Sequence, residues 1–156
     1  MPFGSISELP LFAGLLPAEA AELESRMRRR EYTPQQTIVR EGGAGDAAFL
    51  ILSGLVAVRH KHADSGVEFF LAELGPGQMF GEMALITGKP RTASVVAIEE
   101  TSCAVLERAD FERALMEHPA IALALSRVMA ERLERANQSI GIDFVNLSRL
   151  KIDHGS

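Results

Sequence analysis

The stretch FGEMALITGKPRTAS, residues 80–94, places a carboxylate and a guanidinium nine positions apart on either side of a short apolar run. Gly81 lets the backbone turn sharply, and residues 82–86 can then form about one helical turn. The start of a helix exposes free N–H groups that attract an anion. Arg91 adds a fixed charge and a two-pronged donor suited to a phosphate. The segment therefore predicts a phosphate-binding site.

Glu82 calls for a different partner, because a carboxylate repels phosphate and can only accept hydrogen bonds. A pair of hydroxyl groups, such as the diol of a ribose, supplies the donors that it needs. Ser94 adds a hydroxyl of the protein close to Arg91. A phosphate and sugar hydroxyls side by side describe a nucleotide. A phosphate partner would also satisfy Arg91, since a buried unpaired arginine is costly. The alternative is that Arg91 is structural and pairs with Glu82 or another carboxylate.

Other residues that could do chemistry have simpler interpretations. His60 and His62 could share a strand face and bind a metal, but no third ligand lies nearby, so we predict exposed hairpin residues and no metal. The GGAG run at 42–45 precedes a strand and indicates a turn, and GKP lacks the Ser or Thr of a phosphate-binding P-loop. The sequence contains no nucleophile and base arrangement that would indicate an enzyme.

Composition indicates one globular domain spanning residues 1–156. The chain is 47% hydrophobic, and its net charge of −5 gives no long-range attraction to nucleic acid or anionic lipid. The RMRRR run at 26–30 is therefore interpreted as a solvated helix end. Cys103 is the single cysteine, which excludes an internal disulfide, and we expect it in a buried strand. With no signal peptide or membrane-spanning run, we expect a cytoplasmic protein.

The order of elements predicts an α+β fold. Residues 15–30 resemble a helix with proline and acidic residues early and arginines late. Short strand-like runs, broken by turns at Ser53-Gly54 and at 75–77, then recur and predict an antiparallel barrel over about 30–107. Helices are expected over about 108–150, with a break at His118-Pro119. An apolar stripe marks the last helix: Ile121, Leu125, Val128, Leu133, Ala136 and Ile140.

Three motifs together resemble the cyclic nucleotide-binding domains of the catabolite activator protein family, protein kinase A regulatory subunits and cyclic-nucleotide-gated channels. FGEMAL with PRTAS resembles their phosphate-binding cassette, while GDAAFLILSGLVAV and LGPGQMFGE resemble the strands that lead to it. The resemblance extends from about Leu11 to Asn137. It implies an N-terminal helix, an eight-stranded jelly-roll barrel with a short phosphate-binding helix, and C-terminal hinge and lid helices.

The resemblance also implies roles for individual residues. Arg91 would pair with the cyclic phosphate and Glu82 with the ribose 2′-hydroxyl. Ribose and phosphate would meet the backbone of Gly81, Met83 and Ala84, and the phosphate would be flanked by Thr92, Ala93 and Ser94. The base would lie against Val58 and Leu71, under a lid that contributes Arg132 and Asn137.

The ligand expected from the resemblance is cyclic AMP, with cyclic GMP as the alternative because the Thr92 hydroxyl can reach a guanine amino group. Binding would reorient the C-terminal helices and so control a partner protein or a fused output domain. About 16 residues follow Ile140, so we expect no DNA-binding domain, and the long helix can pair two copies. The alternatives are a ligand-free structural or assembly module, or the sensor fragment of a transcription regulator.

Overall fold

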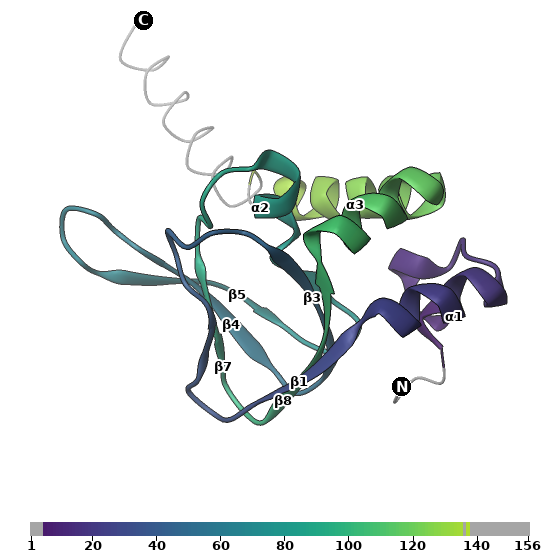
Figure 1. Ribbon diagram of the computed structural model, residues 1–156. Helices are drawn as coiled ribbons and strands as arrows, with labels where there is room; N and C mark the ends of the chain where they lie inside the picture. The colour runs from purple at the N-terminus through teal and green to yellow at the C-terminus, as the bar shows by residue number, and fades with distance from the viewer. Residues whose placement is uncertain (1–4, 136, 138–156) are drawn as a thin grey trace, which may run out of the picture.

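The computed structural model describes residues 5–135 and 137, and its strands form two four-stranded antiparallel sheets (Figure 1). The first sheet has the order β1 (Arg28–Tyr32), β8 (Thr101–Glu107), β3 (Ala47–Ser53) and β6 (Met79–Phe80). The second has the order β2 (Thr37–Val39), β7 (Ser94–Ala97), β4 (Val56–Lys61) and β5 (Glu68–Leu74). The predicted α+β fold with eight antiparallel strands is confirmed.

An apolar core fills the space between the two sheets, because every second residue of each strand points inward. From the first sheet, Phe49, Ile51 and Val105 reach this core, and the second sheet contributes Val56 and Val95. The predicted burial of Cys103 in a strand is confirmed. Strand β3 is apolar along nearly its whole length because its other face is covered as well.

Helices cover that outer face of the first sheet (Figure 1). They are η1 (Ile6–Glu8), η2 (Pro10–Phe12), α1 (Pro17–Arg26), α3 (Arg108–Glu117) and the helix over 119–135, which we call the C-terminal helix. Phe12 of η2 and Phe111 of α3 pack with Leu50 of β3 in a second core. The N-terminal elements therefore hold the base of the C-terminal helices against the sheet.

The predicted helix over 15–30 is wrong in its last four residues, because α1 ends at Arg26 and β1 begins at Arg28. Met27 has extended dihedral angles, and the arginines that follow pair with β8 as an edge strand. Arg28 pairs with Glu107, and Arg29 donates to Ser102. Charged side chains protect an exposed sheet edge from pairing with other chains, so tertiary strand pairing prevailed over helix propensity.

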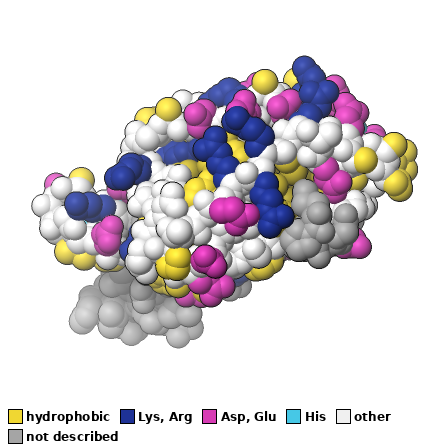
Figure 2. Space-filling view, turned by 60° about the horizontal axis from the view of Figure 1, so that its bottom comes forward, with side chains coloured by type: hydrophobic (Ala, Val, Ile, Leu, Met, Phe, Trp, Pro, Cys, Tyr) yellow, Lys and Arg dark blue, Asp and Glu magenta, His cyan; other side chains and the backbone are white. Residues whose placement is uncertain are grey.

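Basic side chains do not form one continuous surface on the face shown in Figure 2, where Lys and Arg side chains are interspersed with Asp and Glu. Among the described residues, no helix combines the length and the apolar character needed to cross a bilayer. The net charge of −5 fits this mixed surface. Nothing on this face gives nucleic acid the dense basic patch that it requires.

The predicted breaks between elements are confirmed. Gly54 has a φ of 97° at the turn between β3 and β4, and α3 ends at His118 before Pro119 begins the C-terminal helix. The apolar stripe of that helix divides in two. Ile121 and Leu125 are buried in the second core, whereas Leu133 is exposed. Ala136, Ile140 and the predicted helix up to about residue 150 lie outside the described residues, Asn137 excepted.

Candidate functional site

The candidate site is built around α2 (Glu82–Thr87), a helix of six residues that follows β6. Gly81 precedes it with a φ of 85°, a left-handed conformation that residues with a side chain rarely adopt. A Cβ atom at this position would lie 2.8 Å from Nη1 of Arg91 and 3.0 Å from the carbonyl oxygen of Ala47. Glycine is therefore required both for the turn and for the close approach of Arg91.

Arg91 is buried, with only 8% of its surface exposed, and hydrogen bonds hold its guanidinium in place. Its Nη1 donates to the carbonyl of Gly81 at 3.2 Å and its Nη2 to the carbonyl of Ala47 at 3.0 Å. The guanidinium also lies 5.8 Å from the centre of the Phe49 ring. Arginine has five N–H donors, so these two hydrogen bonds leave donors for an anion.

The charge of Arg91 is retained in this buried setting. Burial lowers the pKa of the guanidinium, and the carboxylates of Asp46 and Glu82 oppose that change. Arginine remains protonated in proteins because its reference pKa is so high. Two backbone hydrogen bonds to the loop before β3, Arg91 N–H to Gly43 at 2.9 Å and Gly42 N–H to Arg91 at 2.7 Å, fix the residue from behind.

Glu82 is the second charged residue of the site and is only 1% exposed. Arg132 on the C-terminal helix donates from Nη1 to its Oε1 at 3.0 Å and from Nη2 to the carbonyl of Met79 at 2.9 Å. Oε2 of Glu82 is buried and accepts no hydrogen bond from the residues that the structure describes. The alternative that Glu82 pairs with Arg91 is wrong within those residues, because its ion-pair partner is Arg132.

The pKa of the Glu82 carboxyl is raised by burial, which penalises the charged form. The Glu82 backbone N–H, Arg132 and Arg91 all favour the carboxylate and oppose that rise. A buried acceptor without a donor costs free energy that a bound hydroxyl group would recover. The carboxylate thus has a buried oxygen that can accept one further hydrogen bond.

A cavity of about 360 Å³ opens in front of these two residues, a size typical of small-molecule sites. Its polar end is formed by Glu82, Arg91 and Arg132. Its apolar wall is formed by strand residues of both sheets, which are Val39, Val58, Leu74, Phe80 and Val95. A ligand with one charged end and one flat apolar end fits this lining.

The structure brings nine of the twelve predicted site residues to this cavity: Gly81, Glu82, Met83, Ala84, Arg91, Thr92, Ala93, Val58 and Arg132. Ser94 does not line it, and its hydroxyl accepts a hydrogen bond from the N–H of Glu41 at 2.9 Å. Leu71 is 57% exposed on β5, and Asn137 is exposed on the C-terminal helix. Neither of these two residues reaches the cavity.

Sequence reasoning missed seven residues of the lining, namely Val39, Leu74, Phe80, Thr87, Lys89, Pro90 and Val95. The strand residues among them alternate with outward-facing neighbours, but the register that turns them inward involves distant strands. Thr87, Lys89 and Pro90 lie inside the quoted motif, so their position was a signal that could have been used.

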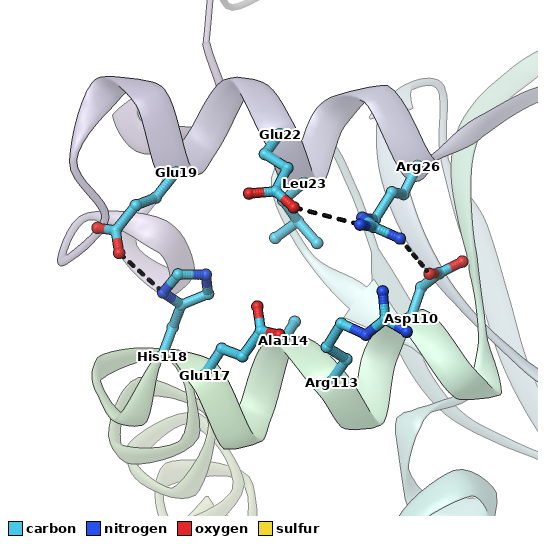
Figure 3. A pocket seen from close by; sticks show the side chains of 9 residues that line it. All are labelled: Glu19, Glu22, Leu23, Arg26, Asp110, Arg113, Ala114, Glu117 and His118. Carbon is cyan, nitrogen blue, oxygen red and sulfur yellow. Dashed lines mark hydrogen bonds and ion pairs between the residues drawn. The ribbon is translucent and has the colours of Figure 1, made fainter.

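A second hollow between α1 and α3 is a charged contact (Figure 3). His118 lies 3.1 Å from Oε2 of Glu19, and Arg26 lies 3.3 Å from Oδ1 of Asp110. The hollow measures about 10 Å³, which is no more than one water molecule requires. These pairs join both ends of α3 to α1 and leave no room for a ligand.

Comparison with known proteins gives consistent results. A family model described as a cyclic nucleotide-binding domain matches residues 29–118. A cyclic AMP receptor protein of Thermus thermophilus is 38% identical over 133 residues, which are 85% of this chain and 61% of the relative. A cAMP-dependent protein kinase regulatory subunit of Aspergillus fumigatus is 36% identical over 110 residues, 70% of this chain and 26% of the subunit.

The same similarity is found among solved structures. The crystal structure of the Thermus thermophilus catabolite activator protein matches with a TM-score of 0.77 and 38% identity. The match covers 85% of this chain and 62% of that one. The chain thus spans about three fifths of the receptor protein and about a quarter of the kinase subunit.

Proposed function

We propose, because this chain belongs to the cyclic nucleotide-binding domain family, that it binds cyclic AMP in the cavity beside α2 and regulates a partner protein or a fused output domain. Cyclic GMP is the alternative ligand. In this proposal the domain is not itself an enzyme, holds no metal and acts in the cytoplasm.

The observation that carries the proposal is that two buried charged residues line one cavity, one with unused hydrogen-bond donors and the other with an unused acceptor. Arg91 offers free N–H donors, and Glu82 offers a buried oxygen without a donor. A cyclic phosphate supplies an anion for the first, and a ribose 2′-hydroxyl supplies a donor for the second. In a cyclic nucleotide these two groups lie on one rigid ring system, which suits a site whose residues are held in place.

The apolar wall supports the placement of the base. Val39, Val58, Leu74 and Val95 present methyl groups along one side of the cavity, where a purine can displace water from their surfaces. Thr92 lines the phosphate end and is exposed, so its hydroxyl is free to contact the base or the solvent. That single hydroxyl is the feature that keeps cyclic GMP as the alternative.

The C-terminal helix supplies a route from binding to regulation. Arg132 already donates to Glu82, so a ribose hydroxyl must share that carboxylate with the guanidinium. A ligand shifts the helix only if it binds one position of the helix better than another. The contact of Arg132 with the site provides such a difference, and the proposed response is a reorientation of the C-terminal helices.

The exposed side of the C-terminal helix suggests how two copies assemble. Ala122, Ser126 and Leu133 are exposed there, and Met129, which lies between them in the sequence, is half-buried because it packs partly against the second core. Their spacing of four, three and four residues is that of a coiled-coil seam. We propose a homodimer through this seam and expect no nucleic-acid contact by these residues.

Two other functions use the same fold. A ligand-free assembly module would keep the seam without binding a nucleotide. A sensor fragment of a transcription regulator would bind the nucleotide and act through an attached DNA-binding domain. The buried Oε2 of Glu82 favours a ligand over the first alternative, since an unused orphan acceptor only destabilises the fold.

Calorimetric titration with cyclic AMP and cyclic GMP tests the proposal. We expect micromolar or tighter binding of at least one of them, lost in Arg91→Ala and in Glu82→Ala. Arg113→Ala is the matched control, because this exposed arginine of α3 lies away from the cavity. If the intact protein binds neither nucleotide, or if Arg91→Ala binds as well as the intact protein, the proposal is wrong.

A further inference from the structure

Arg108, the first residue of α3, connects three segments that lie apart in the sequence. Its Nη1 donates to the carbonyl of Leu85 in α2 at 3.2 Å, and its Nη2 donates to the carbonyl of Gly45 in the loop before β3. Its backbone N–H donates to the carbonyl of Asp46 at 3.0 Å. The Arg108 side chain therefore connects α2 to the loop before β3, and its backbone N–H connects that loop to the start of α3. The side chain is 43% exposed, and its Nη1 also lies 3.6 Å from Oε1 of Glu112 one turn along α3.

The contact with α2 supplies a hydrogen-bond donor to a carbonyl near the C-terminal end of that helix. The last carbonyl groups of a helix have no partner within it, and a cation at that end is favourable. Here the cation comes from a different helix, at a distance of 23 residues in the sequence. If α2 moves, the guanidinium of Arg108 must follow it or lose the bond.

The loop contact brings Arg108 close to the proposed phosphate site. Gly45 lies directly against α2, because a Cβ atom added there would come within 2.2 Å of the Cβ of Ala84. Two residues further on, the carbonyl of Ala47 accepts a hydrogen bond from Arg91. The loop before β3 thus contacts the backbone of Arg91 through Gly42 and Gly43, and it contacts the Arg108 side chain through Gly45.

We propose that Arg108 is a positioning residue that couples the position of α2 to the orientation of α3, and hence to the C-terminal helix. The inference rests on the proposed function, because it names the residue through which occupation of the Arg91 site reaches the helices. Its role is to hold α2, the loop and α3 as one unit. Without it, a ligand binds but moves the helices less.

The variants are Arg108→Gln, Arg108→Lys and the control Arg113→Gln. Arg113 is an exposed arginine on the same helix, so its replacement matches the change of charge and of helix composition. Lysine keeps the charge but not the two-pronged donor, so it should restore only part of the effect. The probe is an environment-sensitive dye on Met116→Cys, since Met116 is 83% exposed on α3. Burial raises the pKa of the native Cys103 thiol to about 12, so that thiol stays unlabelled.

The first measurement uses the ligand-free protein. Arg108→Gln should speed amide hydrogen exchange over residues 82–88, whereas Arg113→Gln should not. Arg108→Gln should also change the emission of the dye on α3 by more than Arg113→Gln does, although residue 113 lies beside the dye at i and i+3 and residue 108 does not. This step decides whether Arg108 joins the two helices even if no cyclic nucleotide binds. Unchanged exchange and emission in Arg108→Gln would overturn the inference.

The second measurement is a titration with cyclic AMP. Arg108→Gln should weaken binding by about 3- to 30-fold, the range expected for a residue that carries coupling between sites. At saturating ligand the change in dye emission should fall to less than half of that in the intact protein. A full response at saturation would overturn the inference, since a merely structural residue changes affinity or stability but not the final state. Failure of the intact protein to bind would instead count against the proposed function.

Discussion

Arg132 donates a hydrogen bond to Glu82 across 50 positions of sequence, from the C-terminal helix to the first residue of α2. The carboxylate that faces the cavity is thus already paired with a guanidinium of the C-terminal helix, the element that we propose to move on binding. Only one of its two oxygens is used, since Oε2 accepts no hydrogen bond from the described residues. A ligand hydroxyl that binds Glu82 would therefore compete with Arg132 for the carboxylate, or share the carboxylate with it.

Replacing Arg132 with glutamine should lower the free energy of unfolding by about 1 to 3 kcal/mol, because a buried carboxylate loses its charged partner. The full cost of breaking a deeply buried pair is not expected, since the Arg132 side chain is 32% exposed and partly screened by water. Urea unfolding measures the change. An equal loss in Arg127→Gln, an exposed arginine on the same helix, would show that the pair itself contributes nothing.

Glu82 should make stability depend on pH in an unusual direction. Burial raises the pKa of its carboxyl in the folded protein, so the folded state binds this proton more tightly than the unfolded state. The stability that Glu82 contributes is therefore greatest below its unfolded pKa, about 4.3, and falls as pH rises through the folded pKa.

The measurement is the difference in unfolding free energy between the intact protein and Glu82→Gln across this range of pH. We expect the difference to shift against the intact protein as pH rises. In Arg132→Gln the same fall should extend to higher pH, because a group that favours the carboxylate is gone. If the difference in unfolding free energy does not vary with pH, burial does not raise the pKa of Glu82 in the folded protein.

Gly81→Ala should destabilise the protein and weaken ligand binding together. The added methyl group faces a φ of 85° and lies 2.8 Å from Arg91, so both the turn and the guanidinium must shift. We expect a loss of about 1 to 3 kcal/mol in unfolding free energy. Gly42→Ala separates the two causes, because Gly42 has a φ of 82° but no atom within 4 Å of the added carbon.

Gly42→Ala should therefore show the cost of the left-handed backbone alone, about 1 to 2 kcal/mol, with a smaller effect on binding. Chemical unfolding gives the stabilities and calorimetry gives the affinities. Equal affinities in the two variants would mean that the contact between Gly81 and Arg91 does not matter for the ligand.

The charged part of the site could be predicted from the sequence because Glu82 and Arg91 lie in one segment of 15 residues, residues 80–94. A short segment closes on itself with little help from the rest of the chain. Val39 and Leu74 line the same cavity from strands that meet only when the two sheets form, so their role depends on register. The ion pair of Glu82 with Arg132 could not be predicted for the same reason, because Arg132 lies 50 residues away on the C-terminal helix.

The wrong prediction of where the first helix ends has a related cause. Arg28, Arg29 and Arg30 continue the helical composition of α1, and only the partner strand β8 makes them a strand. Local propensity is a weak guide where a distant strand supplies the hydrogen bonds. The breaks at Gly54 and at His118 were predictable because turn chemistry is local.

Leu133→Asp should convert the proposed homodimer into a monomer without unfolding it. Leu133 is 61% exposed in the monomer, so the substitution leaves the core intact but places charge in the seam. Analytical ultracentrifugation gives the mass, and thermal unfolding checks the fold. Met116→Asp is the control, since Met116 is more exposed and lies on α3 away from the seam. A monomeric intact protein, or a dimer that survives Leu133→Asp, would contradict the seam.

Thr92→Ala should change the choice between the two nucleotides more than it changes the fold. Thr92 is exposed at the edge of the cavity, and no described side chain depends on its hydroxyl for a hydrogen bond. If that hydroxyl reaches the amino group of guanine, its loss removes one hydrogen bond, worth about 1 kcal/mol or about fivefold in affinity. The ratio of the two dissociation constants should therefore move by about that factor toward cyclic AMP, measured by paired calorimetric titrations. Thr87→Ala, at another threonine that lines the same cavity, is the control, and its effect on stability is measured as well because its hydroxyl accepts a hydrogen bond from the N–H of Lys89. An unchanged ratio in Thr92→Ala would mean that the apolar wall, and not this hydroxyl, selects the base.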